Sequence, residues 1–279
     1  MATRPARFDG QFYASQANDL KEQIKKSFLS KVGPQELPPA DKSMNEELCA
    51  IIVPHAGYQY SGPVAAWAYL QASKYIPKTV LLIGPNHSGF GPEVAIYPEG
   101  SWTTPLGKNS INDELAHKIA DQGFTLDTSA HKYEHSIEVQ LPFLQYIFEH
   151  EFNIIAVSML DQSLATTLKL SKAIANAIKD NDVLIVATTD LSHYENDKST
   201  RKKDSELINK LLKGNIESIY KAVARASISA CGVGPAAVAI NTCALLGAQD
   251  IRLLKYETSA AASGDKDSVV GYSSLAILK

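Results

Sequence analysis

The chain has 279 residues, of which 45% are hydrophobic and 20% are charged, a composition typical of globular proteins that bury a sizeable core. The formal net charge is −3, and this lack of a basic excess argues against nucleic acid and an anionic membrane surface as partners. Three cysteines cannot form a disulfide framework, residues 1–10 lack the apolar core of a signal peptide, and no apolar run could span a membrane, so we expect a cytoplasmic protein.

The first predicted element is an amphipathic helix over Ser15–Lys31, with Ser15 as its N-cap and apolar residues at every fourth position. It is followed by Gly33–Glu47, a linker-like stretch that contains three prolines and many charges. Because no second linker divides the chain, we predict a single domain over residues 1–279.

From residue 48 onwards, short runs of Ile, Val and Leu alternate with helical patterns. Runs of this kind are typical of strands covered on both faces, and they occupy Leu48–Val53, Thr79–Ile83, Phe152–Val157, Val183–Ala187 and Leu275–Leu278. The predicted helices cover Pro63–Tyr75, Asn112–Gln122, Glu134–His150, Ser163–Lys179, Lys198–Lys213 and Gly234–Gly247. This alternation indicates right-handed crossovers, and therefore a three-layer α/β domain with a mostly parallel central sheet.

A histidine follows each of three predicted strands. His55 comes after Leu48–Val53, His87 after Thr79–Ile83, and His193 after Val183–Ala187. Ligands of open α/β sheets bind at the carboxyl ends of the strands, so parallel strands would bring these three histidines to one edge. Neutral imidazole is the commonest metal ligand in proteins, which makes this edge a candidate metal site. In the alternative interpretation, each histidine only hydrogen-bonds the backbone of its own loop.

Cys231 stands just before the apolar helix predicted at Gly234–Gly247. A helix N-terminus is expected to lower the pKa of a nearby thiol, so Cys231 could ligate a metal or act as a nucleophile. The alternative is a small buried cysteine in a glycine-rich turn. Cys49, within a predicted strand, and Cys243, within a predicted helix, are expected to be core residues.

His131 and His135 lie four residues apart, but they do not form the HExxH motif of zinc proteases. We expect His135 either to face a substrate or to support a metal ligand, with a capping or surface contact as the alternative. The glycine-rich nucleotide-binding motifs and the GxSxG motif are absent from the sequence, so neither a nucleotide cradle nor a serine nucleophile elbow is supported.

Six short motifs form a distinctive set, although each motif by itself is only weak evidence for a family. They are FDGQFY at 8–13, PHAGYQYSG at 54–62, GPNHSG at 84–89, EHSIEVQLPF at 134–143, TDLSH at 189–193 and CGVGP at 231–235. Together they resemble the Memo family (mediator of cell motility), whose prokaryotic members are named AmmeMemoRadiSam system protein B. The resemblance extends in order over nearly the whole chain.

The Memo fold resembles that of LigB-type class III extradiol dioxygenases, which are non-haem Fe(II) enzymes. The resemblance implies that His55 and His87 match the two metal-binding histidines and that His193 matches the acid–base histidine. Cys231 takes the place of the glutamate ligand, as is usual in Memo proteins. The resemblance therefore implies iron or copper, while a thiolate, being softer than a carboxylate, favours copper or zinc.

We therefore expect metal-dependent redox chemistry on an unknown substrate, with His193, oriented by Asp190, moving protons. The alternative is a non-catalytic protein that binds a peptide or small molecule in the same cleft, lined by Phe12, Tyr13 and His135. A zinc hydrolase, with Asp190 or His193 as its base, is a third hypothesis.

Overall fold

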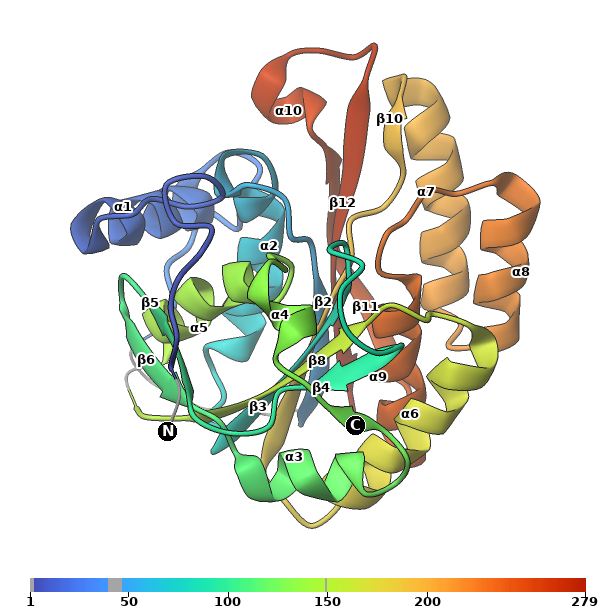
Figure 1. Cartoon of the computed structure of the whole chain (residues 1–279). Coiled ribbons are helices and arrows are strands. Elements are labelled where there is room, and N and C mark those ends of the chain that lie inside the picture. Colours follow the sequence, from blue (N-terminus) through green and yellow to red (C-terminus); the bar gives the residue numbers. More distant parts are fainter. Residues whose placement is uncertain (1–2, 40–46, 149) are drawn as a thin grey trace.

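The computed structural model describes residues 3–39, 47–148 and 150–279, which pack around one mixed sheet (Figure 1). The strand order is β10 (His193–Glu195), β12 (Val269–Leu278), β2 (Leu48–Val53), β9 (Val183–Thr188), β3 (Thr79–Pro85), β8 (Asn153–Met159), β4 (Val94–Ile96) and β7 (Thr125–Leu126). A further strand, β11 (Asp250–Thr258), pairs with β12. The central strands β2, β9, β3 and β8 are parallel and almost entirely buried, which explains their uninterrupted apolar runs.

The helices form the two outer layers of the fold, which confirms the predicted α/β class. On one face, α9 (Val233–Leu245) packs against β2, β9 and β3, and α6 (Leu164–Ile178) and α8 (Ile216–Ala226) pack against α9. On the other face, α2 (Tyr58–Ala72) packs against β2 and β12, with α1 (Ala17–Leu29) and α5 (Leu141–Ile147) beside it. Figure 1 shows these two groups on opposite sides of the sheet.

The remaining elements lie around this core. They are α3 (Asp113–Ala120), α4 (Ser129–Lys132), η1 (Glu138–Gln140), α7 (Asp197–Leu211), α10 (Ala260–Ser263), and a small sheet of β1 (Thr3–Arg4), β5 (Ser101–Thr104) and β6 (Gly107–Ser110). Among the described residues, no helix combines the length and the apolar character that a bilayer span requires.

The sheet is mixed and not mostly parallel, because the pairs around β12 and the pair β4–β8 are antiparallel, and the sequence pattern predicted least around β12. Strand β12 runs antiparallel to β2, β10 and β11, and only its last four residues were predicted. Glycine and serine interrupt the apolar run of β12, and β11 is a half-exposed edge strand, so neither has the continuous run of a central strand.

Two predicted helices begin at other residues than expected, and one helix was not predicted. Helix α1 begins at Ala17 with Gln16 as its N-cap, in place of the predicted Ser15. Helix α2 begins at Tyr58, five residues before the expected start, and contains Pro63 in its second turn. Helix α8 was not predicted, although Asn215 caps it through its side chain. Of the predicted linker Gly33–Glu47, residues 40–46 lie outside the described residues.

The helix predicted over Glu134–His150 is divided. Residues 134–137 are not helical, the 3-10 turn η1 follows, and only α5 is α-helical, with Pro142 in its first turn. Side-chain hydrogen bonds explain the interruption, because the Glu134 carboxylate accepts from the backbone of Ser136 and bends the chain locally.

The side chain of Glu138 is completely buried and ties the N-terminal segment to this region. Its carboxylate pairs with Arg4 at 2.5 Å and accepts hydrogen bonds from the backbone N–H groups of Arg7 and Phe8 and from the Tyr13 hydroxyl. The charged partner and the three further donors offset the free-energy cost of burying this carboxylate. The segment around residues 4–13 is thereby held against η1.

His131 in α4 lies in the core, in ring contact with Tyr97 and Trp102. Burial first, and then the charge of Arg4, lowers its pKa to about 3. The folded protein therefore keeps this imidazole neutral at pH values where an unfolded chain would protonate it.

Replacing His131 with phenylalanine should make the protein less sensitive to acid. Because the folded pKa lies below the unfolded value, the wild-type histidine costs stability as the pH falls below 6.5. Between about pH 7.5 and pH 5, we expect the drop in unfolding free energy to be about 2 kcal/mol smaller in His131→Phe. Urea titrations at both pH values measure this difference, with His117→Phe, on the exposed side of α3, as the control. Identical acid sensitivity in His131→Phe and the wild type would contradict the lowered pKa of His131 in the folded protein.

Candidate metal centre

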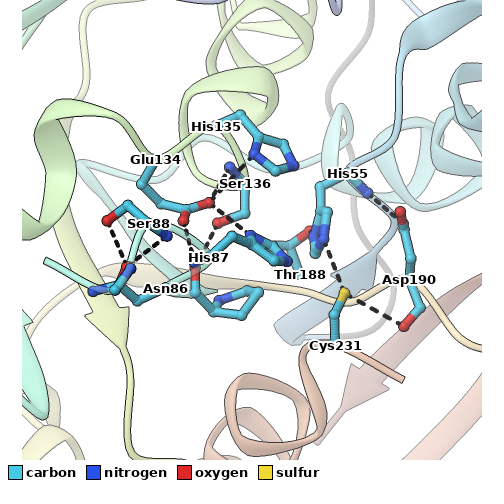
Figure 2. A network of polar contacts seen from close by, with 12 residues as sticks. His55, Asn86, His87, Ser88, Glu134, His135, Ser136, Thr188, Asp190 and Cys231 are labelled. Carbon is cyan, nitrogen blue, oxygen red and sulfur yellow. Dashed lines mark hydrogen bonds and ion pairs between the residues drawn. The ribbon is translucent and has the colours of Figure 1, made fainter. Parts of the chain in front are cut away.

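The carboxyl ends of β2, β9 and β3 meet at one edge of the sheet, and a loop before α9 closes over them (Figure 2). His55 follows β2, His87 follows β3, and Cys231 lies in the loop before α9. The Nε2 atom of His55 is 3.0 Å from the Sγ atom of Cys231, and the rings of His55 and His87 are 5.2 Å apart. One donor atom from each of these three residues lies within 4.8 Å of the others.

The imidazole of His55 is held by a hydrogen bond on the side that faces away from Cys231. Its Nδ1 atom is 2.8 Å from the Thr188 hydroxyl, which also accepts a hydrogen bond from the side-chain amide of Gln140. Its backbone N–H donates to the Asp190 carboxylate at 2.8 Å. Burial, followed by the neighbouring His87, lowers the pKa of His55 to about 3, so its ring is neutral at pH 7, the form that ligates metals.

The imidazole of His87 is oriented by Glu134. Its Nδ1 atom lies 3.0 Å from Glu134 Oε1, and the same carboxylate accepts from the His87 backbone N–H. Burial alone would lower the pKa of His87, but the hydrogen bond and charge of Glu134 raise it overall. Conversely, burial would raise the pKa of Glu134, but His87 lowers it to about 2. A carboxylate behind a ligating histidine is a recurrent arrangement at metal sites.

Cys231 occupies the predicted place before α9, but its pKa shifts in the opposite direction to the prediction. Burial, followed by the negative charge of Asp190, raises the pKa of the thiol. These effects outweigh the helix N-terminus that the sequence analysis relied on. Cys49 and Cys243 are buried in the core, as predicted.

His193 begins β10 at the side of the site, and Ser229 orients it. The backbone N–H of His193 donates to the Ser229 hydroxyl at 2.8 Å, and its Nδ1 atom is 2.9 Å from the Ser229 carbonyl oxygen. The expected orienting residue, Asp190, instead accepts from the backbone of His55. Asp190 is buried, and its pKa is raised by that burial.

These residues form the inner part of a cavity of about 760 Å³. The ring of His135 stacks on His87 at 4.8 Å, and Phe12 stacks on His135 at 4.4 Å, so both line the cavity as expected. Tyr13, the other predicted lining residue, is buried outside the cavity and donates to Glu138.

Sequence reasoning missed the residues that orient the histidines. Thr188 is a polar residue at the carboxyl end of a strand, and the strand-end rule could have identified it. Glu134 stands next to His135 in the sequence, but its pairing with His87 is set by the turn that replaces the predicted helix. Ser229 had no recognisable signal.

The donor set fits a transition-metal ion. One sulfur and two imidazole nitrogens suit copper, zinc or iron, and three protein ligands leave a coordination position free for a substrate or water. The second nitrogen of each imidazole is already hydrogen-bonded, which fixes the orientation of both rings before any ion binds. The neighbouring group His87, Glu134 and His135 also has donor atoms within 4.8 Å of one another.

Replacing Glu134 with glutamine removes the charge beside His87 while preserving the side-chain shape. The effect of burial would then be opposed only by the weaker effect of the Asp190 charge, so we expect the pKa of His87 to fall. An NMR titration of the His87 ring protons in metal-free protein measures the shift. Glu93→Gln, an exposed substitution just before β4, is the control. An unchanged His87 pKa in Glu134→Gln would rule out this electrostatic coupling.

The sequence comparisons with a family model and with related proteins cover nearly the whole chain. A family model described as "Memo-like protein" matches residues 4–276. A MEMO1 family protein of Thermotoga neapolitana is 43% identical over 269 residues, covering 94% of this chain and 95% of the relative. One of Sulfurisphaera tokodaii is 40% identical over 274 residues, covering 95% and 96%. Among solved structures, an uncharacterized protein from Escherichia coli K12 matches with a TM-score of 0.48 and 12% identity, covering 81% of this chain and 99% of that one.

Proposed function

The chain belongs to the Memo family, and on that basis we propose that it is a metal-dependent redox protein whose metal ion is held by His55, His87 and Cys231. The observation that carries the proposal is the meeting of these three donors at the sheet edge. The buried partners of the two imidazoles, Thr188 and Glu134, support it. Iron or copper is the proposed metal.

A bound iron or copper ion would supply one-electron chemistry that unmodified side chains do not provide. The protein's own part is orientation and proton transfer. The hydrogen bond between Nδ1 of His193 and the Ser229 carbonyl leaves Nε2 of His193 to accept a proton from a substrate in the cavity. Asp190 fixes the backbone of His55, and Phe12 and His135 cover one side of the site.

Elemental analysis of anaerobically purified protein without a His-tag tests the metal site. We expect near-stoichiometric iron or copper in the wild type and loss of that metal in both His55→Ala and Cys231→Ala, because each removes one of three ligands. His117→Ala and Cys243→Ala are the matched controls, since neither residue lines the cavity. Circular dichroism confirms that each variant is folded.

Metal retained in the folded His55→Ala variant would overturn the proposal. A wild type that carries no metal and fails to take up Fe(II), Cu(I) or Zn(II) would do the same. Zinc as the bound metal, together with zinc-dependent turnover of esters, would favour a hydrolase over a redox protein.

A second candidate function is supported by the size of the cavity. Its volume of about 760 Å³ far exceeds what a metal ion needs and is in the range of small-molecule sites. A protein that only binds a peptide or small ligand would use the same walls without catalysis. Ligand binding that survives metal removal, in protein without turnover of catechols and other O₂ substrates, distinguishes this function.

His193→Gln should separate metal binding from proton transfer. If His193 moves a proton, the variant keeps the metal content of the wild type, while kcat falls by about 10²–10⁴-fold on any substrate found in the screen. Metal analysis and oxygen uptake are measured on the same samples. Loss of metal from His193→Gln would instead identify His193 as a ligand.

A further inference from the structure

The outer part of the cavity differs chemically from the part near the metal ligands. Its walls come from the start of α2, from β10 and β12, and from the segment around α10; Figure 1 shows β10, β12 and α10 together at the top of the molecule. They contribute hydroxyl groups, aromatic rings and one exposed carboxylate: Ser259, Ser263, Ser268, Tyr60, Tyr194, Tyr272 and Asp265.

No lysine or arginine is among the described residues that line the cavity. Its carboxylates are Asp190 on the inside and Asp265 at the exposed end. The neighbouring Lys266 is not one of the lining residues, and its charge helps to lower the pKa of Asp197, after the hydrogen bonds from Arg201 and Thr258. An anionic ligand would therefore meet no lysine or arginine side chain in the outer cavity.

Tyr272 offers a hydroxyl group that the protein does not use. Its side chain is only 2% exposed and lines the cavity, yet its hydroxyl has no hydrogen-bond partner among the described residues. Burial, followed by Asp190 and by Tyr60 and Tyr194, raises the pKa of this phenol, and all four residues line the same cavity. An unpaired hydroxyl on the wall of a cavity is free to form a hydrogen bond with a ligand.

Tyr194 presents its ring at the cavity rim in an unusual conformation. It has a φ of 58° and is 77% exposed, and its ring lies 5.7 Å from that of His193. A left-handed backbone is strained for a bulky residue, and such strain gathers at functional sites. The faces of aromatic rings attract cations, and an ammonium or guanidinium group also needs oxygen acceptors.

We propose that the outer cavity binds a cationic group, an ammonium or guanidinium, carried by a ligand whose other end reaches towards His55, His87 and Cys231. The aromatic rings supply π faces, Tyr272 supplies an oxygen acceptor, and Asp265 supplies the opposite charge. This inference rests on the proposed function, in that it names the charge class of the ligand for the same site.

The test compares two phenols that differ in the charge of the tail, tyramine with an ammonium and 4-hydroxyphenylacetate with a carboxylate. Isothermal titration of the full chain is carried out on the metal-free and metal-loaded protein. The metal-free form is decisive, because there the carboxylate has no metal ion to coordinate. We expect tyramine to bind about tenfold more tightly than 4-hydroxyphenylacetate in this form.

Asp265→Asn and Asp267→Asn form a matched pair of variants. Both aspartates are exposed in the same loop, but only Asp265 lines the cavity. We expect Asp265→Asn to weaken tyramine binding about two- to fivefold, in a salt-dependent manner, and Asp267→Asn to leave it unchanged.

Equal or tighter binding of 4-hydroxyphenylacetate by the metal-free protein would overturn the inference. Failure of both phenols to bind at millimolar concentration would also overturn it, as would equal effects of the two asparagine variants. Metal analysis of the same samples separates the two proposals. A protein that binds metal but prefers the anion refutes only this inference, and one that prefers the cation without binding metal refutes only the redox function.

Discussion

The parallel pairing of β2, β9 and β3 is the constraint on which the site depends. Val53 is paired with Thr188 and Ile83 with Ala187, so the three strands end at nearly the same level. The residues that follow them must therefore leave the sheet side by side. The loop before α9 can join them because Gly232 has no side chain, since a Cβ atom there would lie 2.2 Å from the Thr188 carbonyl oxygen.

The segment from Glu134 to Gln140 supports the site from behind. Glu134 orients His87, Gln140 bonds to Thr188 beneath His55, and Glu138 anchors the N-terminal segment that carries Phe12. Each of these side chains is buried and hydrogen-bonded, which favours a single arrangement of the cavity wall. These contacts require a turn and a short 3-10 helix where the apolar pattern alone predicted one long helix.

Much of the fold could be predicted because the central strands are covered on both faces. Their uninterrupted apolar runs identified β2, β3, β8 and β9 nearly to the residue. The antiparallel edge was harder, since β11 is half exposed and its pairing with β12 spans many polar residues. The candidate ligands were found for a related reason, because His55 and His87 directly follow buried strands. Ser229 and Glu134 were missed as partners of His193 and His87, because those hydrogen bonds join distant parts of the chain.

The sequence by itself determined the α/β class, the Memo resemblance and the identity of the candidate ligands, because strand periodicity and short motifs are local properties. Tertiary structure alone decided which ring nitrogen of each site histidine is hydrogen-bonded to the protein, which residue orients His193, and in which direction the pKa of Cys231 shifts. Those properties depend on burial and on charges brought close from distant segments. Asp190 is one example, since it faces His55 across 135 residues of sequence. The absence of lysine and arginine from the described residues of the cavity wall is likewise decided by folding, which selects the side chains that face it.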